Sequence, residues 1–579
     1  MSGVWDAAGP EPRAADRLRA RLSARGGEPC AFRSVPEPVL IGRPARGRHL
    51  LDGHLRFAGH LVEIPAGVPP WGFDLPDAVM AELHRFAWLD DLAALGGRTA
   101  WGTARSWTLA WTRRFGRGTG AGWTAARTGR RLMAWIDHAA IVEAGPEAKG
   151  FDADFRRSLG AQGRFLARRW RAAPPGPALV EALTGLLRAG LALSGMGLPV
   201  DAAADALAVE GDAALLADGA VPSRNAERLA ELHARLAWAA RALEAADRTV
   251  PDRLAAALGR AAPVLRSLRH ADGALVRMHG AGGGVEGRLD AALSRGAASR
   301  VERMAMGFAR LSEGRVTVIA DAGRPPEGHA GRGAHASTLA IEVTAGREPL
   351  VVSCGSGAPF GPDWRRVGRA TASHSVLGLE GISSSRLEEP VERGGEVVEL
   401  LGHGPREVAR AIGTRRGAGA EDPGALVLDL SHDGWRESHG LIYRRQIALS
   451  RDGREVTGEE VLAAETDRDV RLLALAADHA GEEGIGFAVR FHLHPDAEVS
   501  ADAGGVGATV ALPSGALWML RHDGVGRLSV EPSVYFDPSR LHPLAAQQIV
   551  LSGRVEEAAT HLRWSLARAD RVAGTRDLE

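Results

Sequence analysis

Histidines occur in four polar stretches of this sequence, and an imidazole can move a proton or bind a metal near neutral pH. His374 lies in the serine-rich stretch RVGRATASHSVLGLEGISSSR, residues 366–386, and His432 lies in SHDGW. His492 and His494 alternate in FHLHP, so a strand would place both rings on one face. Each ring could be a metal ligand or a base, or could instead satisfy a local hydrogen bond.

The fourth stretch, RHADGALVRMHGAGGG, combines His270, Asp272, Arg277 and His279 with a glycine cluster. Glycines let a ligand approach the backbone closely. No predicted strand precedes the stretch, so it is not a dinucleotide or phosphate loop. It could line a binding cleft, or it could be a flexible connector between two domains.

Arginine supplies nearly all of the positive charge, because Lys149 is the only lysine. Guanidinium groups suit two-pronged binding of carboxylate or sulfate, although a GC-rich genome would also explain the composition. Lys plus Arg and Asp plus Glu both number 71, so the net charge predicts neither a nucleic-acid nor a membrane partner. Cys30 and Cys354 lie in different halves of the chain, which argues against a disulfide framework.

The elements that would position these groups fall into two kinds, and the first half of the chain is predicted to be helical. Residues 225–243 place leucines on one helical face, with Asn225 as a suitable N-cap. Similar apolar periods occur in residues 177–193, 251–270 and 287–311. Short loops between helices of ordinary length indicate helical hairpins stacked in series.

Tryptophans are concentrated early in the chain. Flat indoles suit the faces of sugar rings, but they also bury a large area, and core packing is the expectation for most of them. Trp71 lies in VPPWGFDL, a Pro/Gly loop, and is the tryptophan we expect to be exposed and to contact a sugar.

The pattern changes near residue 315, where short alternating runs with turn residues between them begin. Asp452-Gly453 is a strong hairpin signal, and many short strands without intervening helices indicate an antiparallel sandwich. A chain of 579 residues is too long for one core. We therefore predict an α+β multidomain protein, helical over residues 1–310 and antiparallel β over residues 311–579.

Several short motifs occur in an order typical of one family. They are LRFAGH, HRFAWLDDL and TGRRLMAWIDHA in the first half, and HASTLAIEV, PLVVSCGSG, RATASHSVL, SHDGW and FHLHPD in the second. In this order they resemble the heparinase II/III family of polysaccharide lyases over almost the whole chain. The resemblance implies an N-terminal (α/α) toroid, a C-terminal antiparallel β-sandwich, and a substrate cleft between them.

The resemblance also implies a reaction, the β-elimination of a uronate-containing acidic polysaccharide. One residue removes the C5 proton, another protonates the leaving oxygen, and a polar or cationic group neutralises the carboxylate. In the family, an Asn-His pair and a tyrosine come from the toroid, and a histidine and a structural metal site come from the sandwich.

This chain departs from the family pattern at the toroid positions. The Asn-His pair is absent from RRSLGAQGRFL, and the loop where the tyrosine is expected carries Arg224 and Asn225 instead. The only tyrosines, Tyr443 and Tyr535, lie in the β half. The family's proton donor is therefore missing from its usual place.

At the positions that the family uses in its sandwich, some residues of this chain match the family pattern and others are replaced. The catalytic histidine is replaced by Gly333 and the metal aspartate by Ser353, whereas His335 and His374 match family positions. Two histidines hold zinc poorly, since structural sites use about four ligands, but Cys354 could add a thiolate.

Two hypotheses remain open. The first is a lyase with a rearranged catalytic set, and the second is a non-catalytic polysaccharide-binding or assembly protein on the same fold. Four polar loops, residues 218–225, 277–284, 331–337 and 369–375, are expected to line the cleft. The candidate residues are His279, His335 and His374 for catalysis, Arg224, Asn225, Arg369 and Trp71 for substrate binding, and His335, His374 and Cys354 for zinc.

Two expectations about location conflict. No run approaches the ~20 apolar residues of a membrane span, and the first residues contain no apolar stretch of signal-peptide type. On that ground we expect the cytoplasm unless the true start lies upstream, whereas the resemblance implies the cell envelope or periplasm.

Overall fold

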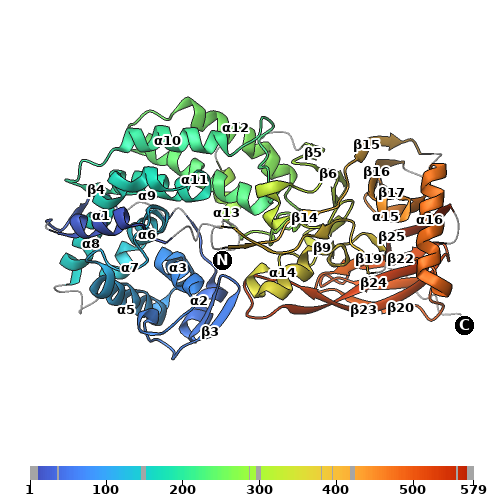
Figure 1. Cartoon of the computed structure of the whole chain (residues 1–579), viewed down its shortest axis with the longest axis horizontal. Coiled ribbons are helices and arrows are strands. Elements are labelled where there is room, and N and C mark those ends of the chain that lie inside the picture. The colour runs from blue at the N-terminus through green and yellow to red at the C-terminus, as the bar shows by residue number, and fades with distance from the viewer. Residues whose placement is uncertain are drawn as a thin grey trace, which may run out of the picture.

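The computed structural model consists of a helical body followed by a β-sandwich (Figure 1). It describes residues 11–25, 27–34, 38, 40–144, 151–285, 287–294, 302–379, 381–393, 396–417, 424–555 and 558–569. We call residues 11–294 the helical body and residues 302–569 the sandwich. The change from helices to strands falls between Leu293, where the last helix of the body ends, and Met304, where the first sandwich strand begins.

The helical body is built mainly of helices, and several of its packed helix pairs are far apart in the sequence. Its helices are α1 (Ala14–Ala24), α2 (Pro44–Leu51), α3 (Asp77–Arg85), α4 (Ala87–Leu95), α5 (Gly97–Phe115), α6 (Ala125–Asp137), α7 (Ala139–Glu143), α8 (Phe151–Arg169), α9 (Pro177–Ala192), α10 (Val200–Ala213), α11 (Ala226–Ala245), α12 (Asp252–Ser267) and α13 (Arg288–Leu293). Its short strands are β1 (Ala31–Phe32), β2 (His54–Phe57), β3 (His60–Glu63) and β4 (Leu193–Ser194). Asn225 caps α11 as predicted, because its side chain accepts a 2.9 Å hydrogen bond from the backbone N–H of Arg228.

Indole rings fill the core of the helical body. Trp71 belongs to this core, and the prediction that it is exposed is wrong, since only 3% of the residue is accessible. Its indole N–H donates to the backbone oxygen of Trp107 over 2.8 Å, and its ring stacks on His84 and Phe86. Burial of a large apolar ring with its N–H satisfied outweighs the loop signal of the neighbouring prolines. Trp71 therefore has no free face for a sugar.

The sandwich contains two large antiparallel sheets. The first has the order β23-β24-β19-β9-β8-β7-β6-β5, with β10 paired to β19, and the second has the order β15-β16-β17-β18-β25-β22-β21-β20. Two small two-stranded sheets, β11-β14 and β12-β13, lie between β10 and β15 in the chain. All strand pairs of the described residues are antiparallel, so the predicted fold class is confirmed.

The strands and helices of the sandwich have the following bounds. The strands are β5 (Met304–Ala305), β6 (Phe308–Glu313), β7 (Val316–Asp321), β8 (Ile341–Ala345), β9 (Glu348–Val352), β10 (Leu377–Leu379), β11 (Arg386–Leu387), β12 (Val391–Arg393), β13 (Glu396–Val398), β14 (Leu401–Gly402), β15 (Val408–Arg415), β16 (Ala425–Trp435), β17 (Leu441–Ser450), β18 (Glu455–Ala463), β19 (Gly486–Leu493), β20 (Glu498–Ala501), β21 (Gly507–Ala511), β22 (Leu517–His522), β23 (Arg527–Tyr535), β24 (Leu544–Arg554) and β25 (Ala559–Ala569). The helices are α14 (Pro362–Arg369), α15 (Arg436–His439) and α16 (Asp467–Ala480).

Two departures from the sequence prediction have local causes. A helix was expected over residues 287–311, but only α13 forms, and the later residues enter β5 and β6. Met306 and Gly307 adopt left-handed backbone angles, φ 50° and 77°, and make the turn between these strands. Helix α16 interrupts the run of strands and lies at the end of the molecule away from the helical body (Figure 1). In the part of the chain that the structure describes, no helix has both the length and the apolar content to span a membrane.

Candidate functional site

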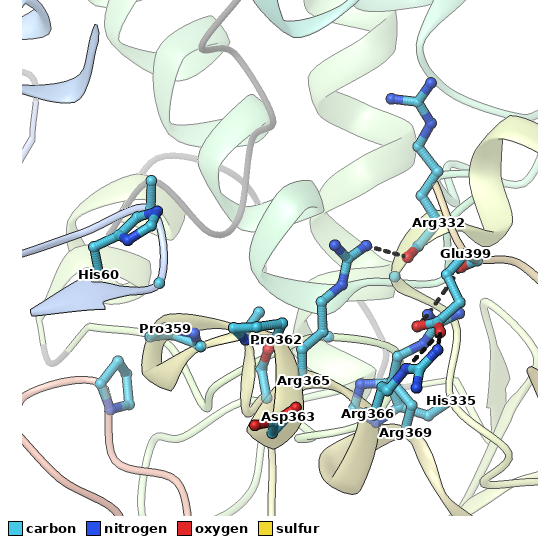
Figure 2. A pocket seen from close by; sticks show the side chains of 18 of the residues that line it. His60, Arg332, His335, Pro359, Pro362, Asp363, Arg365, Arg366, Arg369 and Glu399 are labelled. Carbon is cyan, nitrogen blue, oxygen red and sulfur yellow. Dashed lines mark hydrogen bonds and ion pairs between the residues drawn. The ribbon is translucent and has the colours of Figure 1, made fainter. Parts of the chain in front are cut away.

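A cleft of about 590 Å³ lies between the helical body and the sandwich. Figure 2 shows its walls, with His60 of the β2–β3 hairpin on one side and α14 on the other. Each of the four polar loops predicted from the sequence contributes to the lining, through Asn225, Gly280, Gly333 and Arg369. The cleft is therefore where the two bodies jointly present groups to a ligand.

Arginine dominates the charge of this cleft. The lining guanidinium groups are those of Arg56, Arg228, Arg332, Arg365, Arg366 and Arg369, and together these residues are called the arginine cleft. The lining carboxylates are those of Glu82, Asp363 and Glu399. Glu82 already forms a buried ion pair with Arg85 over 2.9 Å. Because cations outnumber anions, the arginine cleft attracts an anionic ligand.

Helix α14 positions half of these arginines. Pro362 occupies the first turn, where its missing N–H costs nothing. Trp364 anchors the helix by packing edge-on against Phe536, with ring centroids 5.6 Å apart. Arg365 donates to the backbone oxygen of Arg332 over 3.0 Å. This hydrogen bond holds the guanidinium in place and does not neutralise its charge, because the acceptor is an uncharged carbonyl.

The β2–β3 hairpin ties the helical body to the other wall. Arg56 of β2 donates to the backbone oxygens of Pro359 and Pro538, and its guanidinium lies 4.7 Å from the ring centre of Phe360. Burial lowers the pKa of Arg56 to about 10, so the group stays charged at neutral pH. This contact fixes the hairpin against the start of α14.

Behind the cleft lies a second, buried group of polar residues, of which His335 also lines the cleft. Its members are Arg224, His279, Asp321, His335 and His374, and together they are called the histidine cluster. His279 Nε2 lies 3.1 Å from Asp321 Oδ2, and the backbone N–H of His335 donates to His279 Nδ1 over 3.2 Å. His335 Nδ1 and His374 Nε2 share a hydrogen bond of 3.2 Å. The three histidines have accessibilities of 2% or less.

The protonation states of the cluster follow from its burial. Burial lowers the pKa of His374 to about 3 and holds the pKa of His335 well below its usual range, helped by the neighbouring imidazoles. Burial also opposes ionisation of Asp321, but Arg224 and His279 still hold the pKa of its carboxyl below the usual range. The cluster is therefore one ion pair surrounded by neutral rings.

Arg224 joins the two bodies. From the helical body it donates to the backbone oxygens of Met306, Gly307 and Arg324 over 3.0, 2.7 and 2.9 Å, and to Asp321 Oδ1 over 2.5 Å. Because its guanidinium is bonded to four oxygen atoms of the sandwich, Arg224 holds the helical body and the sandwich together. The structure thus places Arg224 in the interdomain contact, whereas it was predicted to bind substrate.

The remaining predicted residues divide between the two regions. Arg369 and His335 line the arginine cleft, and Asn225 lines it with a side chain that also donates to the backbone oxygen of His279 over 2.9 Å. His279 and His374 lie in the histidine cluster, with accessibilities of 1% and 0%. Sequence reasoning brought the correct loops together but could not tell which side chains face solvent.

The zinc prediction does not fit the donor set. The Cys354 sulfur lies 3.6 Å from His492 Nδ1, and burial raises the pKa of its thiol to about 11. Within the described residues, no group of three or more His, Cys, Asp or Glu side chains could hold a metal ion. Structural zinc sites use about four ligands. Zinc binding by His335, His374 and Cys354 is untested, and elemental analysis of the purified protein tests it.

The two tyrosines and His492 are held by local contacts within the sandwich. The Tyr443 hydroxyl donates to Glu460 over 2.5 Å, and Tyr535 lies 4.1 Å beneath the Arg277 guanidinium. His492 bonds to the backbone oxygen of Ala372 over 2.9 Å, which is the local hydrogen-bond alternative considered for FHLHP. Among the described lining residues of the arginine cleft there is no phenylalanine, tyrosine or tryptophan.

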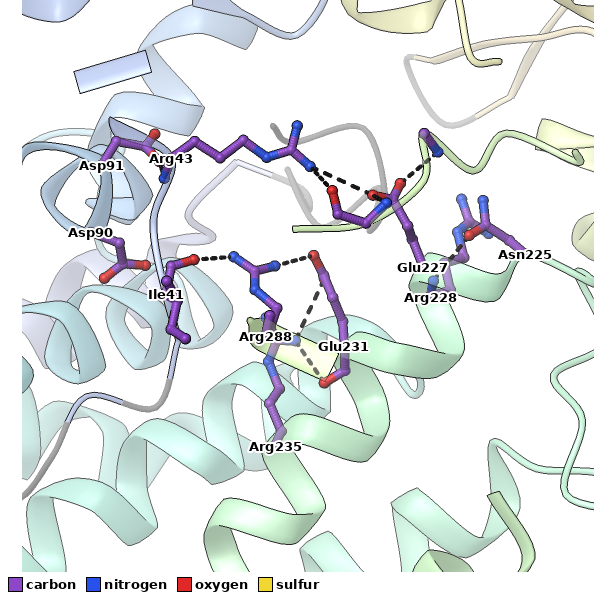
Figure 3. A network of polar contacts seen from close by, with 12 residues as sticks. Ile41, Arg43, Asp90, Asp91, Asn225, Glu227, Arg228, Glu231, Arg235 and Arg288 are labelled. Atoms are coloured by element: carbon purple, nitrogen blue, oxygen red, sulfur yellow. Dashed lines mark hydrogen bonds and ion pairs between the residues drawn. The ribbon is translucent and has the colours of Figure 1, made fainter. Parts of the chain in front are cut away.

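A row of ion pairs links Glu227 and Glu231 of α11 to Arg43 and Arg288 (Figure 3). Glu227 accepts hydrogen bonds from the backbone N–H groups of Gly282 and Gly284 over 2.9 and 2.8 Å, and Arg43 donates to the oxygen of Gly284 over 2.8 Å. Arg288 lies 3.3 Å from Glu231. The glycine-rich stretch is therefore a pinned connector, of which Gly280 reaches the cleft.

Sequence reasoning missed Arg332, Arg365, Arg366 and Glu399. The signal for two of them is PDWRRVGR, an arginine doublet just after a proline that can begin a helix. No sequence pattern around Glu399 indicates a role in the cleft, because the fold brings this residue to the arginines.

Comparison with known proteins agrees with this architecture. A family model described as "Heparinase II/III-like, C-terminal" matches residues 298–565. "FtsZ-localized protein C" of Caulobacter vibrioides (strain NA1000 / CB15N) is 32% identical over 560 residues, which cover 92% of this chain and 89% of that protein.

Solved structures show the same fold at low sequence identity. Heparinase III matches with a TM-score of 0.63 at 12% identity and covers 98% of this chain and 94% of that one. The heparan sulfate lyase HepC from Pedobacter heparinus matches with a TM-score of 0.53 at 13% identity, over 96% of this chain and 88% of that one. At these identities the likeness extends to the fold alone.

Proposed function

The chain belongs to the heparinase II/III-like family, and we propose that it is a non-catalytic member that binds an acidic polysaccharide in the arginine cleft. The observation that carries this proposal is the separation of the two regions. The three histidines of the histidine cluster are buried and bonded to neighbouring polar groups, whereas the surface open to a ligand presents guanidinium groups and the exposed imidazole of His60.

The histidine cluster is poorly suited to β-elimination. A general base must reach the substrate proton and works best with a pKa near the operating pH. His335 is the histidine of the cluster that lines the cleft, but its Nδ1 is bonded to His374 and burial holds its pKa well below the usual range. No tyrosine is present among the described lining residues to protonate a leaving oxygen.

The chemistry of the lining favours a polyanion. Guanidinium groups bind carboxylates and sulfates with directed hydrogen bonds, and several of them along one cleft match charges repeated along a polymer. The family fold supports a polysaccharide as that polymer. The 32% identity with a protein named for its location with FtsZ supports an assembly role in cell division over polysaccharide breakdown. It also favours the cytoplasmic alternative for the location.

Binding and cleavage are tested together on the full-length protein. Oligogalacturonate labelled at its reducing end should bind in a fluorescence anisotropy titration, neutral dextran should not, and absorbance near 232 nm should stay flat. A rise at 232 nm would show an unsaturated uronate and establish the lyase instead. Tighter binding of poly-L-glutamate than of oligogalacturonate would replace the polysaccharide with an acidic protein segment.

The location of binding is tested with paired arginine variants. Arg228→Ala with Arg365→Ala removes one guanidinium from each wall of the cleft and should weaken oligogalacturonate binding about tenfold or more, since charge-assisted hydrogen bonds contribute ~1.5–3 kcal/mol each. The matched control is Arg468→Ala with Arg471→Ala on α16, where two exposed arginines lie away from the cleft. Equal effects of the two double variants would place binding elsewhere.

A further inference from the structure

One carboxylate of the chain itself occupies the arginine cleft. Arg366 Nε donates to Glu399 Oε1 over 2.7 Å, and Arg369 Nη1 lies 3.4 Å from Glu399 Oε2 (Figure 2). Arg369 also donates to the backbone oxygen of Glu399 over 2.9 Å. Each oxygen of the carboxylate is thus held by a different guanidinium, and an external carboxylate could accept the same charge-assisted hydrogen bonds.

The two arginines differ in exposure. The Arg369 side chain is 2% accessible and that of Glu399 is 8% accessible, whereas the Arg366 side chain is 54% accessible. Burial lowers the pKa of Arg369 to about 10, so it remains charged at neutral pH. Arg369 therefore forms the floor of this position, and Arg366 remains reachable from the cleft.

Glu399 reaches the arginines from a separate segment. It follows β13 and lies within residues 386–402, which β11 and β14 close at the base by pairing Arg386 with Gly402. The β11–β14 and β12–β13 pairs are not part of either large sheet. The carboxylate can therefore leave its position without breaking a strand pair of the sandwich core.

We propose that Arg366 and Arg369 form a carboxylate subsite that Glu399 fills in the free protein, and that a carboxylate of the bound polymer displaces Glu399. This inference rests on the proposed function and deepens it, because it assigns the ligand a carboxylate-bearing repeat, such as a uronate, over a purely sulfated one. Glu399 acts as an internal competitor that lowers the affinity for the polymer.

If Glu399 competes with the polymer, a substitution that removes the charge of Glu399 should raise the affinity for the polymer. Glu399→Gln keeps the size of the side chain but binds guanidinium groups more weakly than a carboxylate does. It should raise the affinity for oligogalacturonate about fivefold or more in the anisotropy titration.

Asp363→Asn is the matched control. Asp363 lines the same cleft from the first turn of α14, so both substitutions remove one negative charge from the cleft. Asp363 is exposed, so water screens its charge and the control should raise affinity less than about twofold. A gain that is equal in the two variants would reduce the effect of Glu399 to general electrostatics and overturn the subsite.

Hydrogen exchange gives a second measurement that needs no substitution. Saturating the wild-type protein with oligogalacturonate should increase amide exchange in peptides that cover residues 396–402, because Glu399 loses its partners. Unchanged or slower exchange there, with binding intact, would overturn displacement.

The remaining outcomes separate this inference from the proposed function. Dextran sulfate carries no carboxylate, and tighter binding of it than of oligogalacturonate at equal charge would overturn the carboxylate assignment while leaving a polyanion cleft. Binding by the wild-type protein with no gain in Glu399→Gln would overturn displacement alone. Absence of polyanion binding by both proteins would overturn the proposed function itself.

Discussion

The histidine cluster and the arginine cleft meet at His335, and the two regions differ in how far they exclude water. The cluster buries an Arg224–Asp321 ion pair among neutral imidazoles, whereas the cleft keeps several guanidinium groups within reach of water. A catalytic group needs access to substrate, and a structural ion pair needs exclusion of water. The difference teaches that residue type alone does not identify a catalytic site, since the side chains typical of catalysis are here the structural ones.

Removing the anion of the histidine cluster should have the largest effect. Asp321→Ala leaves the charge of Arg224 buried at the contact between the bodies, and loss of one partner of a buried pair costs ~3–5 kcal/mol. Urea unfolding followed by circular dichroism should show this loss. A cost below ~1 kcal/mol would mean that water reaches Arg224, and the contrast between the two regions would not hold.

Acid should weaken the histidine cluster before it weakens the cleft. The pKa of His374 is about 3 in the folded protein, far below that of an unfolded histidine, so the unfolded chain binds the proton first as the pH falls. Stability is therefore complete above about pH 6.5 and falls by up to ~1.4 kcal/mol per pH unit, for this group, between about pH 6.5 and 3. Urea unfolding between pH 7.5 and 5.5 measures the slope.

The variant His374→Gln identifies the group responsible for part of that slope. It should show a shallower dependence on pH than the wild type, whatever its stability at pH 7.5. His542→Gln serves as the control, because His542 is exposed. Parallel slopes for wild type and His374→Gln would assign the acid sensitivity to other groups.

Raised salt should affect binding in the arginine cleft more than it affects the stability that the buried histidine cluster provides. Raising sodium chloride from 0.1 to 0.5 M should weaken oligogalacturonate binding severalfold, since exposed charges are screened as the Debye length shortens. The midpoint of urea unfolding should change little, because buried pairs are screened less. Binding that is insensitive to salt would show that the cleft does not act through its charge.

Chelation should have the smallest effect. The hydrogen bond of 3.2 Å between His335 and His374 already satisfies one nitrogen of each ring without a metal. Dialysis against EDTA should therefore shift the Tm by less than about one degree, and elemental analysis should find zinc well below one atom per chain. Stoichiometric zinc, or a loss of several degrees, would restore the metal hypothesis for these rings.

Periodicity in the sequence was enough to predict a helical half followed by an antiparallel β half, because burial repeats along a helix or a strand. Residues 226–245 form the predicted helix with Asn225 as its cap, and Gly453, with φ 68°, makes the predicted hairpin turn. Periodicity failed at Met306 and Gly307, where a turn between two strands is decided by two backbone conformations.

The site was predictable only as a set of loops. Which side chain of a loop faces water depends on partners far along the chain, and Trp71 shows this because its indole is held by Trp107 and covered by other rings. Glu399 and Arg366 are 33 residues apart, and neither segment carries a sequence pattern that predicts their contact. Long-range pairing of this kind requires the three-dimensional structure.

The fastening of Arg224 to four oxygens of the sandwich has a mechanical consequence. A buried guanidinium that bridges the two bodies resists both opening and closing of the cleft, because either movement would strip it of its partners. The cleft therefore keeps a fixed width and does not open and close around a ligand. A polymer that fits meets a surface already in its bound shape, so little conformational freedom is lost on association, and one that is too thick is refused.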